Sequence, residues 1–290
     1  MAAKFWRPWG QRFAGNRVAL AALLVLCIII LASIAAPWIA PYNPTKGSLA
    51  ERLLPPSLAP ARDGGFPHLL GTDAQGRDVL ARLIYGGRVS LSVAFTVVAL
   101  AGCLGTVLGL VAGYAGGRVD LLLMRLVDIQ SSFPGLLVAL TFVMVLGPGQ
   151  RNLTIALLIN GWMVHARMAR SQVLTLREST MVEAARAIGC RMPRIAFGHI
   201  LPNIISPLIT TYVLELAHMI GAEANMSFLG YGIQPPLASW GLMIGEGREY
   251  ITNAWWLVVF PGLIIALTIL CLNLVGNWVR EEFDPLLGRR

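Results

Sequence analysis

Apolar stretches of about the length of a membrane-spanning helix recur six times along the chain, and they constrain the fold more than any other feature. Crossing the hydrocarbon core of a bilayer takes roughly 20 predominantly apolar residues. The six stretches are Val18–Ala40, Val89–Tyr114, Asp120–Gly147, Leu153–Met168, Ile204–Leu229 and Ala254–Val279. The first is too long for the apolar region of a signal peptide and ends in a poor cleavage site, so we interpret it as a retained helix. The sequence therefore predicts an all-α integral membrane protein with six transmembrane helices.

The composition excludes the main classes of soluble protein. Of the 290 residues, 56% are hydrophobic and 13% are charged, whereas soluble domains have about 45–50% apolar and about 25% charged residues. A disordered chain is excluded by the same comparison. The net charge of +8 does not indicate nucleic-acid binding, because the basic residues flank the apolar spans, where they orient a membrane protein. We therefore expect contact with a lipid bilayer and with no nucleic acid.

The distribution of basic residues predicts the side of the membrane on which each loop lies. With the N-terminus inside, fifteen of the 23 Lys and Arg residues fall on the cytoplasmic side, as the positive-inside rule requires. Both termini are then cytoplasmic. The predicted segments are a cytoplasmic N-terminal segment (1–17), a first transmembrane helix (18–40), an extracytoplasmic loop (41–88), a five-helix core (89–280) with a long cytoplasmic loop at 169–203, and a cytoplasmic tail (281–290).

The sequence contains no recognisable pattern of catalytic or metal-ligating residues. The four Cys are dispersed and lack the paired spacing of a zinc or redox site. The phosphate-binding pattern G-x-x-x-x-G-K-[ST] is absent, and so are H-E-x-x-H, G-x-S-x-G and G-x-G-x-x-G. We therefore expect that the chain binds no metal or cofactor and catalyses no reaction by itself.

The long cytoplasmic loop has the signals of two short helices. A Thr-x-x-Glu pattern ending at Glu183 fits the capping box that starts a helix, and Gly189 suits the end of that helix. Pro193 favours the first turn of a second helix, which Pro202 is expected to end. We call this helix–glycine–helix projection, residues 178–202, the inner knob.

The inner knob also carries the residues of a family pattern. The pattern is EAA-x3-G-x9-I-x-L-P, and the chain differs from it at one position, where His199 replaces the usual Ile. The matching residues are Glu183, Ala184, Ala185, Gly189, Leu201 and Pro202. The loop resembles the EAA loop of bacterial ABC importer permeases. This resemblance implies that the loop holds a coupling helix that docks in a groove of a cytoplasmic ATPase subunit.

Three further stretches narrow the resemblance to the dipeptide/oligopeptide/nickel group of these permeases, and within it to the C-type subunit. They are residues 70–86, 113–128 and 229–241. Together with the inner knob they extend the resemblance over nearly the whole chain. It implies the type I, MetI-like permease fold and half of a translocation pathway for di- or oligopeptides.

The resemblance also implies a set of partners in the bacterial inner membrane. These are a homologous second permease subunit, two cytoplasmic ATPase subunits that bind ATP and Mg²⁺, and an extracytoplasmic substrate-binding protein. We expect the binding protein to contact the loop 41–88 and the segment after Leu229. The candidate docking residues are Asp73, Arg77, Asp78 and Trp240.

Ionisable residues inside the predicted spans are candidates for lining the pathway, because charges are costly at membrane depth. Glu215, His218 and Glu223 lie on the fifth span at spacings that favour roughly one helix face. They either line a polar path or join this helix to the partner subunit. On the third span, Arg125 and Asp128 have the spacing of a local ion pair, and Asp128 is a further candidate for the path.

Other functions remain alternatives. Within the same group, the chain could be a nickel or nickel-chelator permease. A channel, a secondary transporter or an integral membrane enzyme would belong to a different class. A secondary transporter has no need of a loop that docks an ATPase, and a membrane enzyme needs catalytic residues that the sequence lacks.

Overall fold

The computed structural model describes residues 16–61 and 65–283. Within these residues, the regular elements are helices and a single isolated bridge between Thr72 and Asp78. The all-α prediction is therefore confirmed for the described part of the chain. Most of the predicted N-terminal segment (1–17) and of the C-terminal tail (281–290) lies outside the described residues.

Each of the six predicted spans coincides with a helix or a helix pair. The elements are α3 (Arg17–Ile34) with the short α4 (Ala36–Ile39), α5 (Val79–Ala115), α6 (Gly117–Ser131) with α7 (Gly135–Leu146), α8 (Gln150–Leu176), α11 (Leu201–Phe228) and α13 (Trp256–Phe283). Four helical segments are long and apolar enough to span a membrane: α3, α5, residues 192–228 and α13. The bent pair α6–α7 is a fifth if it is counted as one span. The remaining predicted span, the fourth along the chain, is α8, which is more polar and does not qualify by these criteria.

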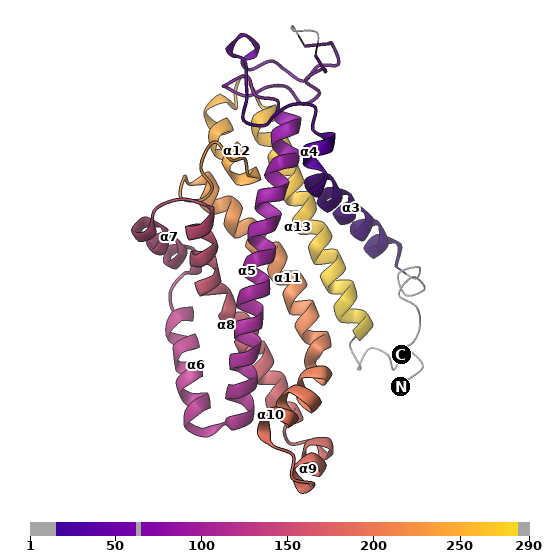
Figure 1. Cartoon of the computed structure of the whole chain (residues 1–290), viewed down its shortest axis with the longest axis vertical. Coiled ribbons are helices and arrows are strands. Elements are labelled where there is room, and N and C mark those ends of the chain that lie inside the picture. Colours follow the sequence, from indigo (N-terminus) through magenta and orange to yellow (C-terminus); the bar gives the residue numbers. More distant parts are fainter. Residues whose placement is uncertain (1–15, 62–64, 284–290) are drawn as a thin grey trace.

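The third predicted span is a broken helix and not a straight one. Helices α6 and α7 meet at an angle of 85°. The break falls just before Pro134, which lacks an N–H group and disfavours a helical backbone at the residue that precedes it. As a result, α7 lies across the side of the bundle (Figure 1).

Glycines on α5 allow the more polar α8 to pack closely against it. A Cβ atom on Gly105 would lie 2.8 Å from the Cβ of His165, and one on Gly109 would lie 2.8 Å from the Cβ of Ala169. Both α8 side chains are buried. Small residues at four-residue spacing permit such close approach of helices in membranes. The polar helix α8 is thus held by α5 and does not depend on lipid contact along this face.

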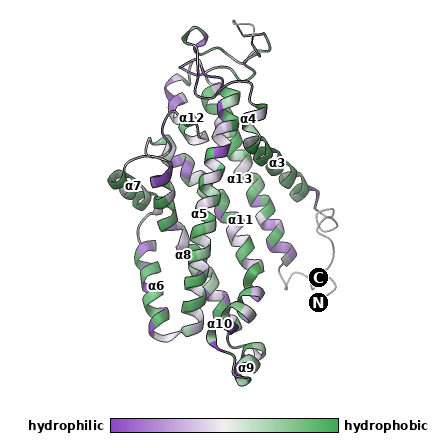
Figure 2. Cartoon of the chain, viewed as in Figure 1, coloured by the Kyte–Doolittle hydropathy of each residue, from purple (hydrophilic) through white to green (hydrophobic). Residues whose placement is uncertain are grey.

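The helical bundle carries one cap at each end (Figure 1). The outer cap comprises residues 41–61 and 65–78, α12 (Trp240–Gly247) and the 3-10 turn η3 (Arg248–Tyr250). The inner knob, with α9 (Thr180–Ala187) and α10 (Met192–Ile195), lies at the opposite end. Between the caps, Figure 2 shows hydrophobic residues along α3 and α7, as expected of helices that face lipid or another subunit.

Pro202 does not end the second helix of the inner knob, as the sequence predicted. Helix α10 continues through a π-helical turn, Ala196–Ile200, and Pro202 lies in the first turn of α11. The π turn changes the hydrogen-bond pattern just before the residue that supplies no N–H group. Residues 192–228 therefore form one helical segment from the inner knob to the outer end of the bundle.

Candidate functional site

Helix α9 of the inner knob begins where the sequence predicted, but without the predicted capping box. Its N-cap is Ser179, whose carbonyl oxygen accepts a hydrogen bond from the Glu183 backbone N–H (3.0 Å). The Ser179 hydroxyl donates to the carbonyl oxygen of Leu176 (2.6 Å) and makes no capping bond to α9. The Glu183 side chain is therefore left exposed on the knob.

Gly189 ends α9 in the geometry that the sequence predicted. Its φ angle is +81°, in the left-handed region that only glycine adopts at low cost. The Gly189 N–H donates to the carbonyl oxygen of Arg186 (2.9 Å), and the Cys190 N–H donates to that of Ala185 (3.0 Å). These two bonds form a Schellman motif, which fixes the direction in which the chain leaves α9.

The residues of the EAA pattern divide between the two faces of α9. Ala185 is buried and, with Val182, packs in a core cluster that includes Leu110 of α5. Ala184 and Glu183 are exposed, and Ile188 beside them is 80% exposed. The buried face therefore anchors the knob to the bundle, while the opposite face presents apolar surface. Three exposed Arg side chains also belong to the inner knob: Arg186, Arg191 and Arg194.

The last two residues of the pattern connect the inner knob to α11. Leu201 packs against the same core cluster as Ala185. Pro202 is exposed in the first turn of α11. The pattern therefore spans both the exposed surface of the knob and its junction with the fifth predicted span.

Glu215 and His218 form a polar pair on α11. The His218 Nδ1 atom lies 3.1 Å from a carboxylate oxygen of Glu215. The His218 side chain is 71% exposed, whereas that of Glu215 is 10% exposed. Because a polar side chain is unfavourable against hydrocarbon, this face of α11 is expected to contact water or another subunit.

Glu223 does not share the exposed face of His218, so the prediction that all three residues lie on one face is wrong for this pair. Each residue turns the helix by about 100°, so His218 and Glu223 point about 140° apart. Glu223 is 0% exposed. Its Oε1 atom accepts a hydrogen bond from the Ser227 hydroxyl (2.6 Å). Glu223 therefore lies inside the chain, and its place on a translocation path stays a prediction.

Asp128 on α6 is exposed and pairs with α8. Its carboxylate lies 3.4 Å from the Arg167 guanidinium, and Arg167 also donates a hydrogen bond to the Ser131 hydroxyl. The predicted local pair with Arg125 is not found among the described ion pairs. Asp128 therefore joins two helices at their exposed edge.

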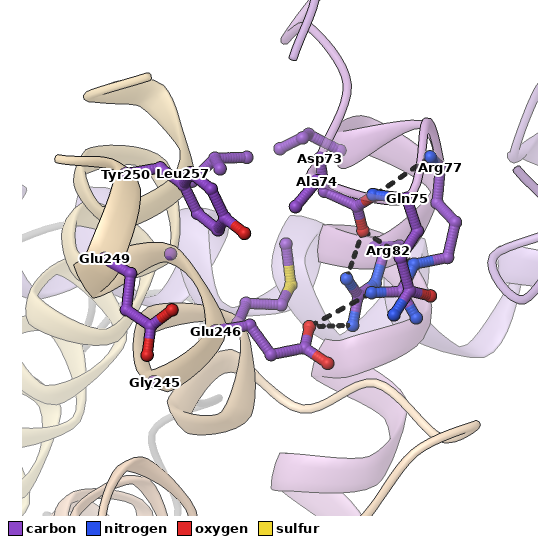
Figure 3. A pocket seen from close by; sticks show the side chains of 13 residues that line it. Asp73, Ala74, Gln75, Arg77, Arg82, Gly245, Glu246, Glu249, Tyr250 and Leu257 are labelled. Atoms are coloured by element: carbon purple, nitrogen blue, oxygen red, sulfur yellow. Dashed lines mark hydrogen bonds and ion pairs between the residues drawn. The ribbon is translucent and has the colours of Figure 1, made fainter. Parts of the chain in front are cut away.

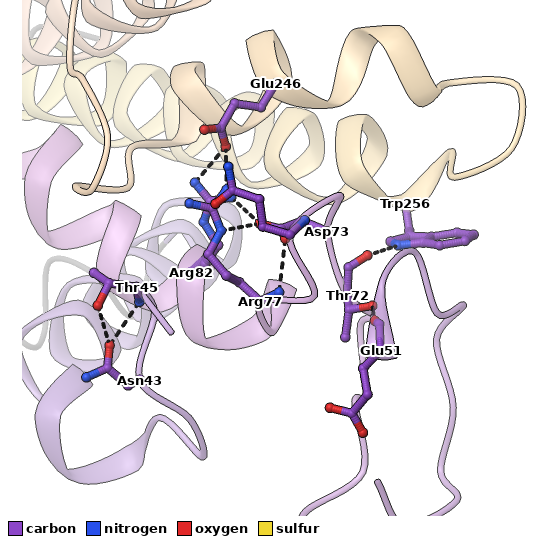
Figure 4. Close-up of polar contacts among 10 residues, drawn as sticks. Asn43, Thr45, Glu51, Thr72, Asp73, Arg77, Arg82, Glu246 and Trp256 are labelled. Carbon is purple, nitrogen blue, oxygen red and sulfur yellow. Dashed lines mark hydrogen bonds and ion pairs between the residues drawn. The ribbon is translucent and has the colours of Figure 1, made fainter. Parts of the chain in front are cut away.

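Ion pairs hold the outer cap together. Asp73 accepts hydrogen bonds from the Arg77 Nε atom (2.6 Å) and from Arg82. Glu246 on α12 lies 3.2 Å from Arg77 and 2.7 Å from Arg82. We call these four residues the outer clamp, and Figure 4 shows them together. The clamp joins the loop before α5 to α12.

The charge of Asp73 is stabilised by its partners. Burial alone would raise the pKa of this carboxyl group, but the Arg82 and Arg77 guanidinium groups and two backbone N–H groups outweigh burial. The pKa of Asp73 therefore lies below its ordinary value. The clamp is held by a carboxylate that stays ionised at neutral pH.

The four predicted docking residues all lie inside the chain. Asp73 and Arg77 belong to the clamp and are 6% and 5% exposed. Asp78 caps α5 by accepting from the Ala81 N–H (2.7 Å), and it accepts from His68 Nδ1 (2.8 Å). Trp240 is 1% exposed. These residues therefore shape the outer cap, and their direct contact with a binding protein stays a prediction.

A polar pocket of about 220 Å³ lies beside the clamp. Figure 3 shows Asp73, Arg77 and Arg82 on one side of it and Glu249, Tyr250 and Leu257 on the other. Small-molecule sites are commonly about 300–1,000 Å³, so this pocket is small for a solute. Among the described residues, no group of three or more His, Cys, Asp or Glu side chains is placed to hold a metal ion.

Glu246 and His68 were not predicted from the sequence. Glu246 is separated from Arg77 by 169 residues, and no local pattern connects the two. His68 contacts Asp78 and stacks on Tyr42, with ring centroids 4.9 Å apart. His68 lies close in sequence to the Gly- and Asp-containing segment 71–78, and Glu246 lies between two glycines of α12; neither position reveals a partner.

Comparison with known proteins agrees with this architecture. Residues 105–289 match the family described as "Binding-protein-dependent transport system inner membrane component", and residues 4–56 match the "N-terminal TM domain of oligopeptide transport permease C". The MetNI methionine ABC transporter, solved in inward-facing conformations, has a chain that superposes with a TM-score of 0.59 at 18% identity. That superposition covers 70% of this chain and 97% of the other, and it shows the fold.

Named relatives from several bacteria align with almost the whole chain. The "Di/tripeptide transport system permease protein DppC" of Pseudomonas aeruginosa is 40% identical over 98% of this chain and 92% of its own length. The "Dipeptide transport system permease protein DppC" of Haemophilus influenzae is 38% identical over 98% of this chain and 94% of its own length. The "Putative peptide transport system permease protein" of Brucella suis is 41% identical over 91% of this chain and 86% of its own length. The chain belongs to the family of binding-protein-dependent transport system inner membrane components, the permeases of bacterial ABC importers.

Proposed function

We propose that the chain is one permease subunit of an ATP-driven importer of di- or oligopeptides in the bacterial inner membrane, with both termini in the cytoplasm. A homologous second permease subunit would complete the translocation path. Two cytoplasmic ATPase subunits would bind ATP and Mg²⁺, and an extracytoplasmic binding protein would deliver the peptide. The peptide relatives support this solute class, and the distribution of basic residues supports the orientation.

The observation that carries the proposal is the connection from the inner knob to the polar face of α11. The inner knob exposes apolar surface at Ile188 together with three arginines, which suits docking into a groove of another protein. Residues 192–228 continue from the knob as one helical segment. Movement of a docked ATPase can therefore reach the Glu215–His218 pair without crossing a flexible loop.

The polar pair suits a path for peptides. Backbone amides and charged termini need polar contacts while they cross the membrane, because unsatisfied polar groups are costly there. The His218 side chain is exposed on the chain, and the largely buried Glu215 carboxylate contacts its imidazole ring. A helix that presents such a pair to the second permease subunit would supply half of a polar path.

In the proposed cycle, the chain itself binds and orients, and the ATPase subunits carry out the chemistry. Closure of the ATPases moves the inner knobs, and the helices alternate between inward-facing and outward-facing arrangements. The outer cap would receive the binding protein through the surface that the clamp and Asp78 hold in shape.

Uptake by the reconstituted complex tests this function. The complex of both permeases and both ATPases is placed in liposomes with the binding protein, and uptake of a labelled dipeptide is compared with uptake of nickel. We expect dipeptide uptake that requires ATP and survives collapse of ion gradients. Nickel uptake without dipeptide uptake would favour the nickel permease, and uptake driven by an ion gradient alone would contradict an ATP-driven importer.

A further inference from the structure

We propose that Glu246 is a positioning residue that transmits docking of the binding protein from the outer loop to α12 and onward to α11. This inference rests on the proposed function, because it assumes a binding protein that docks on the outer cap. It adds a residue, and a route from the outer cap into the membrane, that the family assignment does not supply.

The first step of the route is the outer clamp. Arg77 and Arg82 come from the loop and the start of α5, and Asp73 holds both of them from the same segment. Within the described ion pairs, Glu246 is the acid that α12 contributes to the clamp. A displacement of the loop therefore acts on α12 through the Glu246 carboxylate.

The second step is the contact of α12 with the membrane helices. At the start of α12, the Trp240 backbone N–H donates to the Ser90 hydroxyl (3.3 Å), and the Trp240 ring N–H donates to the Leu83 carbonyl oxygen (2.9 Å), both on α5. A Cβ on Gly241 would lie only 2.5 Å from the Cα of Ala224 on α11. Helix α12 thus packs directly on the part of α11 that follows the Glu215–His218 pair.

The clamp is built so that one member can move while the others stay. The Arg77 and Arg82 side chains are 6% and 2% exposed, whereas that of Glu246 is 28% exposed. The Nε and Nη2 atoms of the buried Arg82 make no hydrogen bond to the described residues, so Nη2 contacts Glu246 as an ion pair only. The pocket of about 220 Å³ beside it leaves room for the Glu246 side chain to shift.

Glu249 provides a matched control for Glu246. Both carboxylates line the same pocket, and they are three residues apart. Glu249 is exposed and makes no ion pair among those described. A variant at Glu249 changes the charge of the outer cap to the same extent without touching the clamp.

The test measures ATP hydrolysis by the purified four-subunit complex against the concentration of peptide-loaded binding protein. For Glu246→Gln we expect the maximal stimulated rate to fall by about fivefold or more, the lower end of usual allosteric couplings. The half-saturating concentration of binding protein and the unstimulated rate should stay at wild-type values. Glu249→Gln should match wild type in all three quantities.

Three outcomes would overturn the inference. A raised half-saturating concentration with an unchanged maximal rate would make Glu246 a docking contact. An equal loss in the two variants would assign the effect to surface charge. A loss of the unstimulated rate or of thermal stability, in parallel with the stimulated rate, would make its role merely structural.

Glu246→Asp keeps the test decisive if the Gln variant does not assemble. It retains the charge but withdraws the carboxylate by one methylene group, so we expect a maximal rate between those of wild type and an uncoupled complex. A wild-type maximal rate for Glu246→Asp would then overturn the inference. An absence of stimulation in the wild-type complex itself would contradict the proposed function, and is thereby distinguished from a loss confined to the Glu246 variants.

Discussion

Asp73 holds two buried arginines, and its role depends on its charge. The side chains of Arg77 and Arg82 are almost completely buried. Without the carboxylate, two guanidinium groups would share the single half-buried Glu246. The sequence predicted Asp73 as a candidate docking residue. Its burial could not be predicted, because the residue that completes the clamp lies on a helix far along the chain.

Replacing Asp73 with Asn should destabilise the outer cap strongly. Breaking a buried ion pair by removing one partner costs about 3–5 kcal/mol, so the thermal unfolding midpoint of the complex should fall. Glu178→Gln is the control, since its partner Arg177 contacts it at an exposed surface, where pairs contribute about 0–1 kcal/mol. Equal midpoints for the two variants would show that the clamp contributes no stability.

The lowered pKa of Asp73 gives the outer cap a defined acid limit. A carboxyl group whose pKa falls on folding contributes stability above its unfolded pKa, and this contribution is lost as pH falls through the folded pKa. Because the pKa of Asp73 lies below the reference value of 3.8, the cap should stay closed from neutral pH to about 4.

Amide hydrogen exchange of residues 71–78 checks this limit. We expect protection at pH 5 that is lost only below the reference value of 3.8. In Asp73→Asn the protection should be weak at every pH and should show no such transition. Loss of protection between pH 5 and 7 in the wild-type protein would contradict the assignment to Asp73.

At the scale of the element, α9 depends on how it ends. Gly189 has a φ of +81° and open space around its Cα, so backbone conformation and not crowding restricts the residue type. The sequence predicted this helix end correctly because a Schellman motif is local. It did not predict the course of 196–202, where a π turn replaces the helix end expected at Pro202, since such a turn depends on packing against α5 and α8.

Gly189→Val should uncouple transport and leave the bundle folded. A residue with a Cβ in the left-handed region costs about 1–2 kcal/mol, and relief of this strain would redirect the chain after α9. We expect normal amounts of protein in the membrane, with loss of peptide uptake and of ATPase stimulation by loaded binding protein. The measurement is the retention of ATPase subunits on the purified complex, together with both activities.

Gly198→Ala is the matched control for that variant. Gly198 also lies in the inner knob with open space around it, but its φ angle is not positive. It should retain uptake and stimulation. If Gly189→Val behaved like Gly198→Ala, the direction of the chain after α9 would not matter for coupling.

At the scale of the whole molecule, the sequence predicted the number and order of the spans but not which faces meet. Glu215, His218 and Glu223 were expected on one face, yet the structure exposes His218 and buries Glu223. Sequence spacing places residues around a helix, whereas the neighbours of that helix decide which side is covered. The close packing of α8 against the glycines of α5 was likewise not predicted from the sequence.

Cysteine labelling can show which exposed faces contact water. In a background without the four native cysteines, His218→Cys in the assembled complex should react with a polar thiol reagent, because thiols react as thiolates, which need water. Leu263→Cys on α13 should not react, although Leu263 is 60% exposed on the isolated chain, since an apolar face is expected to contact lipid. Labelling of Leu263→Cys with none of His218→Cys would place the path elsewhere.

The polarity of α8 bears on how the protein is made. A nascent helix leaves the insertion machinery for lipid when its own transfer is favourable, and polar side chains within the span make that transfer less favourable. Helix α8 carries Asn160 and His165 inside its predicted span and Arg167 and Arg170 at its cytoplasmic end, so it partitions less readily than the more apolar spans. It should enter the bilayer only once it can pair with α5, which is synthesised earlier. The glycines of α5 would then serve biogenesis first, by receiving a helix that lipid alone would not accept.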